Sequence, residues 1–142
     1  MILKLFLSLS IIFSLSIGIG VFQSRPEPQE TVLSAERNVT EILRRSCFDC
    51  HSSEVRWPWY SYIFPLSSLI AHHIKEGREE LDFSVWDSLS VKKRNSLADK
   101  IIEEIDKNEM PLKSYTFMHR EAVLSSEDRE ILKNWAKGFM DE

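Results

Sequence analysis

The chain has 142 residues, a length that fits a single compact domain of ordinary size. Its 18 lysines and arginines against 22 aspartates and glutamates give a formal net charge of −4, and without a basic cluster this balance excludes nucleic acid as an expected partner. With only 4 glycines, hairpin turns have little support, which excludes an all-β fold and leaves an all-α fold as the prediction.

Residues 1 to 22 predict an export signal, because Lys4 is followed by an apolar run, Leu5 to Phe22, that only serine and glycine interrupt. The run is near the lower limit of about 17 to 25 residues for a helix that crosses a bilayer, and it exceeds a usual signal core. An A-x-A-like cleavage site is absent, although Gly18, Gly20 and Ser24 are small enough to permit cleavage. A cleaved signal peptide and an uncleaved membrane anchor both remain open. We favour the anchor, and either interpretation places the folded part on the periplasmic side of a bacterial inner membrane.

Residues 23 to 33 predict a linker, since Pro26 and Pro28 stand among polar residues without an apolar period. The main domain, residues 34 to 142, is expected to begin near Ser34, which can cap a first helix. One face of that helix carries Val39, Ile42, Leu43 and Ser46.

The helix leads directly into Cys47-Phe48-Asp49-Cys50-His51, the C-x-x-C-H pattern typical of covalent haem attachment. Two thiols at this spacing can each form a thioether with one haem vinyl group, and the adjacent histidine can serve as the proximal iron ligand. We therefore predict one haem c, bound through Cys47, Cys50 and His51.

Other uses of a C-x-x-C pair fit the chain less well. A thioredoxin-like redox couple needs a strand context that the sequence does not predict. A zinc site would have to recruit two of His72, His73 and His119. A disulfide that closes so short a loop would stabilise the fold little.

An aromatic stretch follows, with Trp57, Pro58, Trp59 and Tyr60 at its start. These side chains can wall a haem, or they can complete a small helical core, and both interpretations remain open.

A second helix is expected from about residue 65 to 80, and Gly77 can end it early. Its apolar face carries Leu66, Leu69, Ile70, His73 and Ile74. The side chains of His72 and His73 point about 100° apart, so at most one of them faces an iron. A histidine in such a helix is more often buried in a core or an interface than bound to a metal.

The last two predicted helices complete a domain of about four. One covers residues 90 to 108, ends before Met110-Pro111 and places Leu97, Ile101, Ile102 and Ile105 on its apolar stripe. The other opens at Ser125 with a capping box to Asp128 and turns Ile131, Leu132, Trp135 and Phe139 inward.

The sixth iron position is expected to hold Met110, in the loop from Glu109 to Tyr115. A thioether sulphur stabilises ferrous iron, as an electron carrier requires. Met118, His119 and His73 remain alternatives, as does an open position, and Met110 can also be a core methionine that fills a gap.

Several motifs together resemble the bacterial haem-binding domain family, which comprises small exported c-type haem proteins. The resemblance covers about residues 34 to 140, and its motifs are Cys47 to Glu54, Arg56 to Ser61, Ala71-His72-His73, Glu76-Gly77-Arg78, Met110-Pro111-Leu112 and Tyr115. It implies thioethers at Cys47 and Cys50, proximal ligation by His51, a functional site around residues 57 to 60, and a fold like a small all-helical cytochrome c.

The sequence thus predicts a monohaem c-type cytochrome that passes single electrons between redox partner proteins and acts as a carrier rather than an enzyme. A haem-based ligand sensor or peroxidase-like protein with an open distal site is one alternative. The other is an accessory module of the envelope whose haem mainly completes its core.

Overall fold

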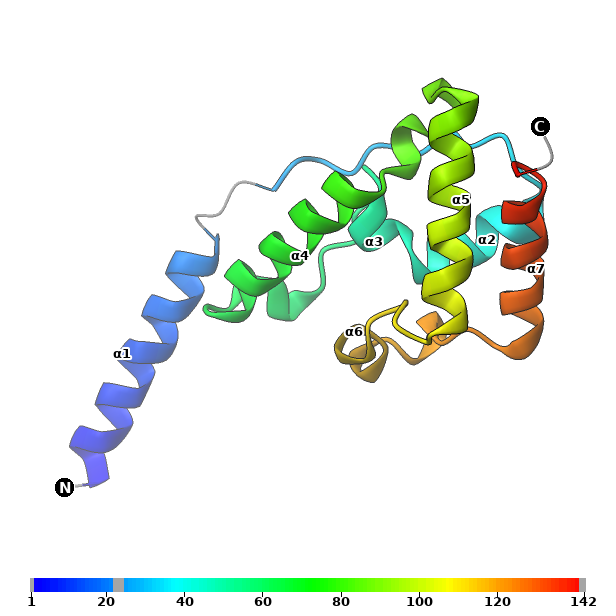
Figure 1. Cartoon of the computed structure of the whole chain (residues 1–142). Coiled ribbons are helices and arrows are strands. Elements are labelled where there is room, and N and C mark those ends of the chain that lie inside the picture. Colours follow the sequence, from blue (N-terminus) through cyan, green and yellow to red (C-terminus); the bar gives the residue numbers. More distant parts are fainter. Residues whose placement is uncertain (1, 22–24, 141–142) are drawn as a thin grey trace.

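The computed structural model describes residues 2–21 and 25–140, and within them every regular element is helical (Figure 1). The α-helices are α1 (Ile2–Val21), α2 (Arg37–Ser46), α3 (Phe48–His51), α4 (Leu66–Glu80), α5 (Val91–Asp106), α6 (Lys113–Met118) and α7 (Ser126–Lys137). Three 3₁₀ turns, η1 (Trp59–Tyr62), η2 (Phe83–Ser88) and η3 (Arg120–Ala122), complete the described elements. The predicted all-α class is confirmed.

The four helices expected for the domain correspond to α2, α4, α5 and α7, but α3 and α6 were not expected as separate helices. They have 4 and 6 residues, too few for an apolar period to show in the sequence. Helix α6 takes up part of the segment from Glu109 to Tyr115 that the sequence presents as a loop.

The start of α2 corrects the predicted cap. Glu36, not Ser34, is the N-cap residue, because the backbone N–H of Ser34 donates to the Asp87 carboxylate at 2.8 Å and holds that residue outside the helix. The predicted inner face is confirmed, since Val39, Ile42, Leu43 and Ser46 are the buried residues of α2.

The ends of the longer helices follow local chemistry. Helix α4 continues through Gly77 to Glu80, so this glycine does not end it. Helix α5 stops at Asp106 because Asn108 adopts a left-handed conformation, with φ of 56°, and the next N–H bonds back to the Glu104 carbonyl at 3.1 Å. The predicted capping box between Ser125 and Asp128 opens α7.

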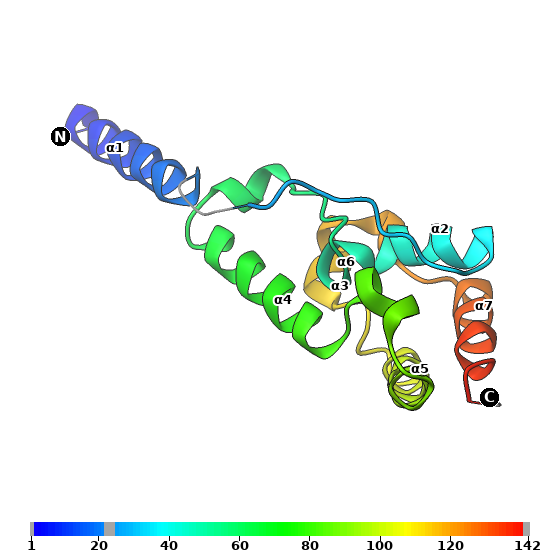
Figure 2. The same cartoon turned by 90° about the horizontal axis from the view of Figure 1, so that it is seen from above.

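The core lies among α2, α5, α7 and η2 and is rich in aromatic rings. Trp86 is at its centre, 1% exposed, with ring centroids 5.3 Å from Trp135 and 5.2 Å from Phe139. Leu132 and Leu97 are buried in the same cluster. Helix α5 packs against α7, and α4 packs against α3 on the other side of the molecule (Figures 1 and 2).

Helix α1 extends away from the rest of the chain and contacts η1 (Figure 1). The side chains of residues 4 to 15 are exposed and mostly apolar. No helix in the described part of the chain is both long enough and apolar enough to cross a membrane. Residues 22 to 24, which include Ser24 and the expected start of the linker, lie outside the described residues.

From residue 25 on, the segment expected as a linker has no helix but lies against the domain. Gln29 donates its N–H to the Ser53 carbonyl at 3.0 Å, and Thr31 donates its N–H to the Glu54 carboxylate at 3.2 Å. Leu33 belongs to the hydrophobic core cluster. The packed part of the chain thus begins before Ser34.

Candidate functional site

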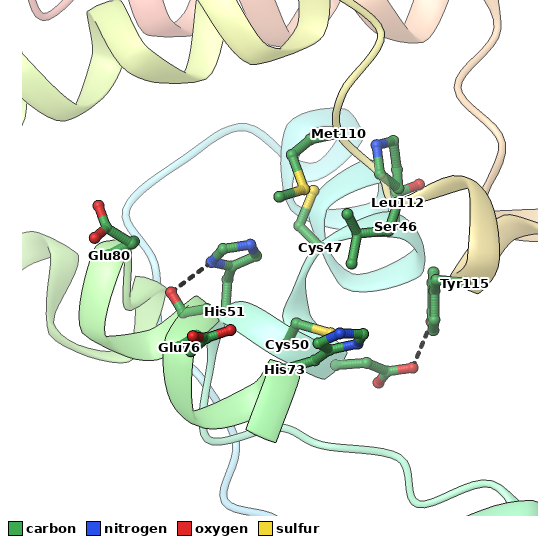
Figure 3. Close-up of a pocket in the computed structure, with 13 residues that line it drawn as sticks. Ser46, Cys47, Cys50, His51, His73, Glu76, Glu80, Met110, Leu112 and Tyr115 are labelled. Carbon is green, nitrogen blue, oxygen red and sulfur yellow. Dashed lines mark hydrogen bonds between the residues drawn. The ribbon is translucent and has the colours of Figure 1, made fainter. Parts of the chain in front are cut away.

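Helix α3 brings the three residues of the C-x-x-C-H motif onto one turn. The backbone N–H groups of Cys50 and His51 both donate to the Cys47 carbonyl, at 3.2 and 3.0 Å. Side chains three and four residues apart project from the same side of such a turn. All three motif residues line one cavity of about 300 Å³, together with Met110 (Figure 3).

The residue after the first cysteine anchors this turn in the core. Phe48 is fully buried, and its ring centroid is 5.6 Å from that of Phe83. The cysteines and the histidine therefore project from a rigid support rather than from a surface loop.

The His51 ring is oriented by two backbone carbonyls. Its Nδ1 lies 2.8 Å from the Gly77 oxygen and 3.0 Å from the Leu81 oxygen (Figure 3). Carbonyl oxygens only accept hydrogen bonds, so Nδ1 is the donor, and in the neutral ring Nε2 is the nitrogen with a lone pair for a metal. Histidines that bind metals typically show this arrangement, in which the second ring nitrogen donates to a backbone carbonyl.

Gly77 permits the close approach of α4 to α3 that creates this contact. A Cβ atom at residue 77 would lie only 2.8 Å from the Cys50 carbonyl oxygen. Any side chain would therefore push the two helices apart, and the carbonyls that orient His51 would move with α4. Gly77 therefore does not end the helix, as the sequence allowed, but permits close packing at a position within one of the family-like motifs.

Both cysteines are free thiols in protected surroundings. Burial, with the nearby Cys50, raises the pKa of Cys47 to about 12. Burial, with the nearby Asp49, raises the pKa of Cys50 to about 11. Reactive redox cysteines have lowered pKa values, so this pair does not resemble a thioredoxin-type couple.

Two further cavities adjoin the first and share its lining residues. One, of about 330 Å³, shares Cys47, His51 and Met110 and extends toward core residues of α5 and α7. The other, of about 300 Å³, shares Cys50 and His73 and extends along α4. Together they flank the motif on two sides with mostly apolar walls, as a large flat apolar cofactor requires.

The apolar face predicted for α4 forms one of these walls. Leu66, Leu69, Ile70, His73 and Ile74 all line the third cavity. Leu66 and Leu69 remain 43% and 49% exposed, so protein atoms do not cover this face completely. An amphipathic helix normally buries its apolar face, and a large apolar ligand beside Cys50 would cover this one.

The aromatic stretch divides between two surroundings. Pro58, Trp59 and Tyr60 line the third cavity beside Cys50. Trp57 lies near Pro26 and Ile74 instead, and the Arg25 guanidinium stands 5.4 Å from its ring. Only part of the stretch therefore stands close enough to wall a cofactor.

The candidates for the sixth ligand are now separated in space. Met110 lines both cavities that His51 lines, and His73 lines one of them. Met118 lines the third cavity only and is half exposed. His119 is not among the residues of the three cavities, because its Nε2 lies 2.7 Å from the Tyr60 hydroxyl and its Nδ1 3.3 Å from the Glu121 carboxylate.

Three residues of the site, Asp49, Arg56 and Tyr115, lie within the family-like motifs, but the sequence alone indicates no role for them. Asp49 is buried between the cysteines, and its carboxylate accepts hydrogen bonds from Arg56 and from the Tyr115 hydroxyl. Burial and the bond to Asp49 raise the pKa of Tyr115, and the same carboxylate raises the pKa of Arg56. Their signal in the sequence was their place within the family-like motifs.

A family model described as a haem-binding domain matches residues 15–138. No curated protein and no solved structure matches the chain significantly. The matched range contains all the residues that line the first cavity, and it confirms the resemblance that the motifs indicate. Haem binding therefore has the support of the family match as well as of the geometry.

Proposed function

The chain belongs to the haem-binding domain family, and on this premise we propose that it is a monohaem c-type cytochrome that transfers single electrons outside the cytoplasm. In this proposal Cys47 and Cys50 hold the haem covalently, and His51 and Met110 ligate its iron. The observation that carries the proposal is the His51 ring, whose Nδ1 is fixed by two carbonyls while its Nε2 remains available in the cavity that both cysteines and Met110 line.

The attachment step balances without a further reactant. Cys47 and Cys50 would each add their S–H across one haem vinyl double bond, so that a carbon–sulphur bond would form and the thiol hydrogen would pass to the other vinyl carbon.

When bound, haem supplies an iron that accepts and releases one electron. The chain's own residues position and shield it. The carbonyls of Gly77 and Leu81 hold the His51 ring in one orientation, and the neutral Met110 sulphur would favour the reduced state. The apolar walls from α4 and α5 limit the access of water to the haem. Fewer water molecules then reorient when the iron changes its charge, which keeps the reorganisation energy of electron transfer small.

The proposed location rests on the N-terminal segment, which would direct export whether or not it is then cleaved. If it is retained, it would tie the protein to the membrane. The partners would be redox proteins, and the net charge of −4 favours partners with a basic docking face.

Covalent attachment is tested on the full chain produced in a bacterial host with a c-type haem attachment system. We expect haem to remain bound to the wild-type protein during denaturing electrophoresis. A Cys47→Ser, Cys50→Ser double variant should release its haem under the same conditions. A wild-type protein that releases its haem on denaturation would contradict the c-type assignment.

Electron transfer is tested by a redox titration of the same preparation with small mediators, followed by visible absorption. The expected result is a reversible transition with the slope of one electron. If the haem exchanged no electrons with any mediator, the carrier function would fail and the accessory-module alternative would take its place.

A further inference from the structure

Asp49 connects three separate parts of the site. It is 8% exposed, and its carboxylate accepts hydrogen bonds from the backbone N–H of Arg56 at 3.0 Å, from the Arg56 side chain at 3.1 Å, and from the Tyr115 hydroxyl at 2.6 Å. Arg56 also donates to the last carbonyls of α2. A carboxylate with this many donors is held firmly in one position.

Tyr115 stands five positions after Met110, on α6. The segment that carries Met110 is held at its other end by α5, since the N–H groups of Glu109 and Met110 lie 3.1 and 3.4 Å from the Glu104 carbonyl. Met110 therefore lies between two attachments, one to α5 and one through Tyr115 to the helix that carries Cys50 and His51. Figure 3 shows Met110 beside Cys47 and Tyr115 farther along the lining of the same cavity, where a dashed line marks its hydroxyl's hydrogen bond to the Asp49 carboxylate.

Packing alone does not hold α6 in this place. The helix has six residues, and none of them is buried. The Tyr115 ring is stacked on His119, with centroids 4.4 Å apart and planes 18° apart, and His119 is itself fixed by the Tyr60 hydroxyl at 2.7 Å. The ring contact and the hydroxyl contact are thus separable, because a phenylalanine would keep the stack and lose the hydrogen bond.

We propose that Tyr115, through its hydrogen bond to Asp49, is a positioning residue that holds Met110 against the iron bound by His51 and so keeps external ligands out. The inference rests on the proposed His51 and Met110 ligation. It assigns to Asp49 the task of connecting α3, which carries Cys50 and His51, with the segment that carries Met110.

The test uses the haem-loaded full chain with Tyr115→Phe, and Tyr62→Phe as the matched control, because Tyr62 is partly exposed and lines none of the three cavities. Tyr115→Phe should weaken the far-red absorption band that ferric haem shows with a methionine ligand. It should also speed carbon monoxide binding to the reduced protein by roughly tenfold, the scale of one lost hydrogen bond to a charged group. Haem content and far-ultraviolet circular dichroism should stay unchanged, and Tyr62→Phe should match the wild type.

Two outcomes would overturn the inference, and they differ in what else they remove. If the wild type shows the far-red band and slow carbon monoxide binding, and Tyr115→Phe does the same, only the positioning role fails. If the wild type itself lacks the band and binds carbon monoxide at once, the Met110 ligation fails as well. Should Tyr115→Phe fold poorly, Asp49→Asn, which keeps the shape but not the charge, must show the same changes in weaker form.

Discussion

The two proposed iron ligands are held in different ways. His51 is fixed by two backbone carbonyls at 2.8 and 3.0 Å, whereas Met110 is half-buried and lies in a segment without helical hydrogen bonds around it. A ligand without such support depends on the residues at both ends of its segment. The sixth position is therefore the part of the site where a single substitution changes the chemistry most.

Met110→Ala should leave haem attachment intact, because the cysteines and His51 are not altered. The far-red band should disappear, the reduction potential should fall, and the reduced protein should bind carbon monoxide. We expect the free energy of unfolding to drop by about 2 kcal/mol, the low end for methionine truncation, since the side chain is only half-buried. Spectroscopy and chemical denaturation measure these effects, with Met118→Ala as the control. A band that persisted in Met110→Ala would show that another residue is the ligand.

How far the site can be predicted from the sequence depends on the distance over which its contacts act. Cys47, Cys50 and His51 form one turn, so their spacing alone indicates their joint use. The bond between Asp49 and Tyr115 joins residues 66 positions apart, and only the packing of α6 decides it. The same holds for the carbonyls that orient His51, which come from α4 and from the residue after it.

At the scale of elements, the apolar stripes of α2, α5 and α7 were sufficient to predict these helices, because most residues of each stripe lie in the common core or pack against it. The stripe of α4 was equally clear, but it lines a cavity beside the motif, which no periodicity can reveal. Short helices such as α3 depend on tertiary contacts rather than on a stripe, and they could not be predicted.

Gly77→Ala tests the contact between α4 and α3. In an exposed helix this change would stabilise the protein by about 1 kcal/mol through helix propensity. Here the new Cβ would meet the Cys50 carbonyl at 2.8 Å, and overpacking typically costs about 1 to 3 kcal/mol. We therefore expect a net loss of stability and a changed haem spectrum, since the Gly77 carbonyl orients His51. Thermal denaturation and visible spectra measure both, and exposed Glu79→Ala on the same helix is the control. A stabilised Gly77→Ala protein would show that the close approach is not rigid.

Asp128 makes the stability of the first turn of α7 depend on pH. Burial disfavours its charged form, but hydrogen bonds from Ser125 and the ion pair with Arg45 at 2.9 Å outweigh burial and lower its pKa. The unfolded chain therefore binds a proton at this site at higher pH than the folded one. The stabilisation is complete above the usual aspartate pKa of about 3.9 and is lost as the pH falls through the lowered value.

Asp128→Asn should cost up to about 1 kcal/mol near neutral pH, because it removes the negative charge that pairs with Arg45 in the first turn of α7. The difference from the wild type should shrink below about pH 4, because the wild-type carboxylate is then protonated as well. Denaturation at several pH values measures this, with Asp99→Asn on the exposed surface of α5 as the control. A difference that stayed constant down to acid pH would mean that the charge contributes nothing.

At the scale of the whole molecule, the chain divides into a core side and a cavity side. The core side, with α2, α5, α7 and η2, contains the aromatic cluster around Trp86. The cavity side, with α4 and α6, has few buried residues of its own, Ser67 and Ile74 in α4 and none in α6. Haem would fill the space between the two sides, so the cavity side should depend on it more than the core side does.

Two truncations of the N-terminal segment test where the packed part of the chain begins. Deletion of residues 1–24, with a cleavable export signal in their place, should leave the melting temperature and the haem spectrum nearly unchanged. The described side chains of α1 from residue 4 to 15 are exposed, and Arg25, whose guanidinium stands 4.1 Å from the Tyr62 ring, is retained.

Deletion of residues 1–33 should behave differently, because it removes buried Thr31 and Leu33 and the hydrogen bonds to Ser53 and Glu54. Loss of one buried leucine typically costs about 2 to 5 kcal/mol. The melting temperature should therefore fall by roughly 10 °C or more, while the haem content per folded molecule stays the same. Thermal denaturation followed by the far-ultraviolet circular dichroism of the helices measures this fall. If both truncated proteins melted alike, residues 25–33 would be a true linker, and the domain would begin near Ser34 as the sequence alone suggests.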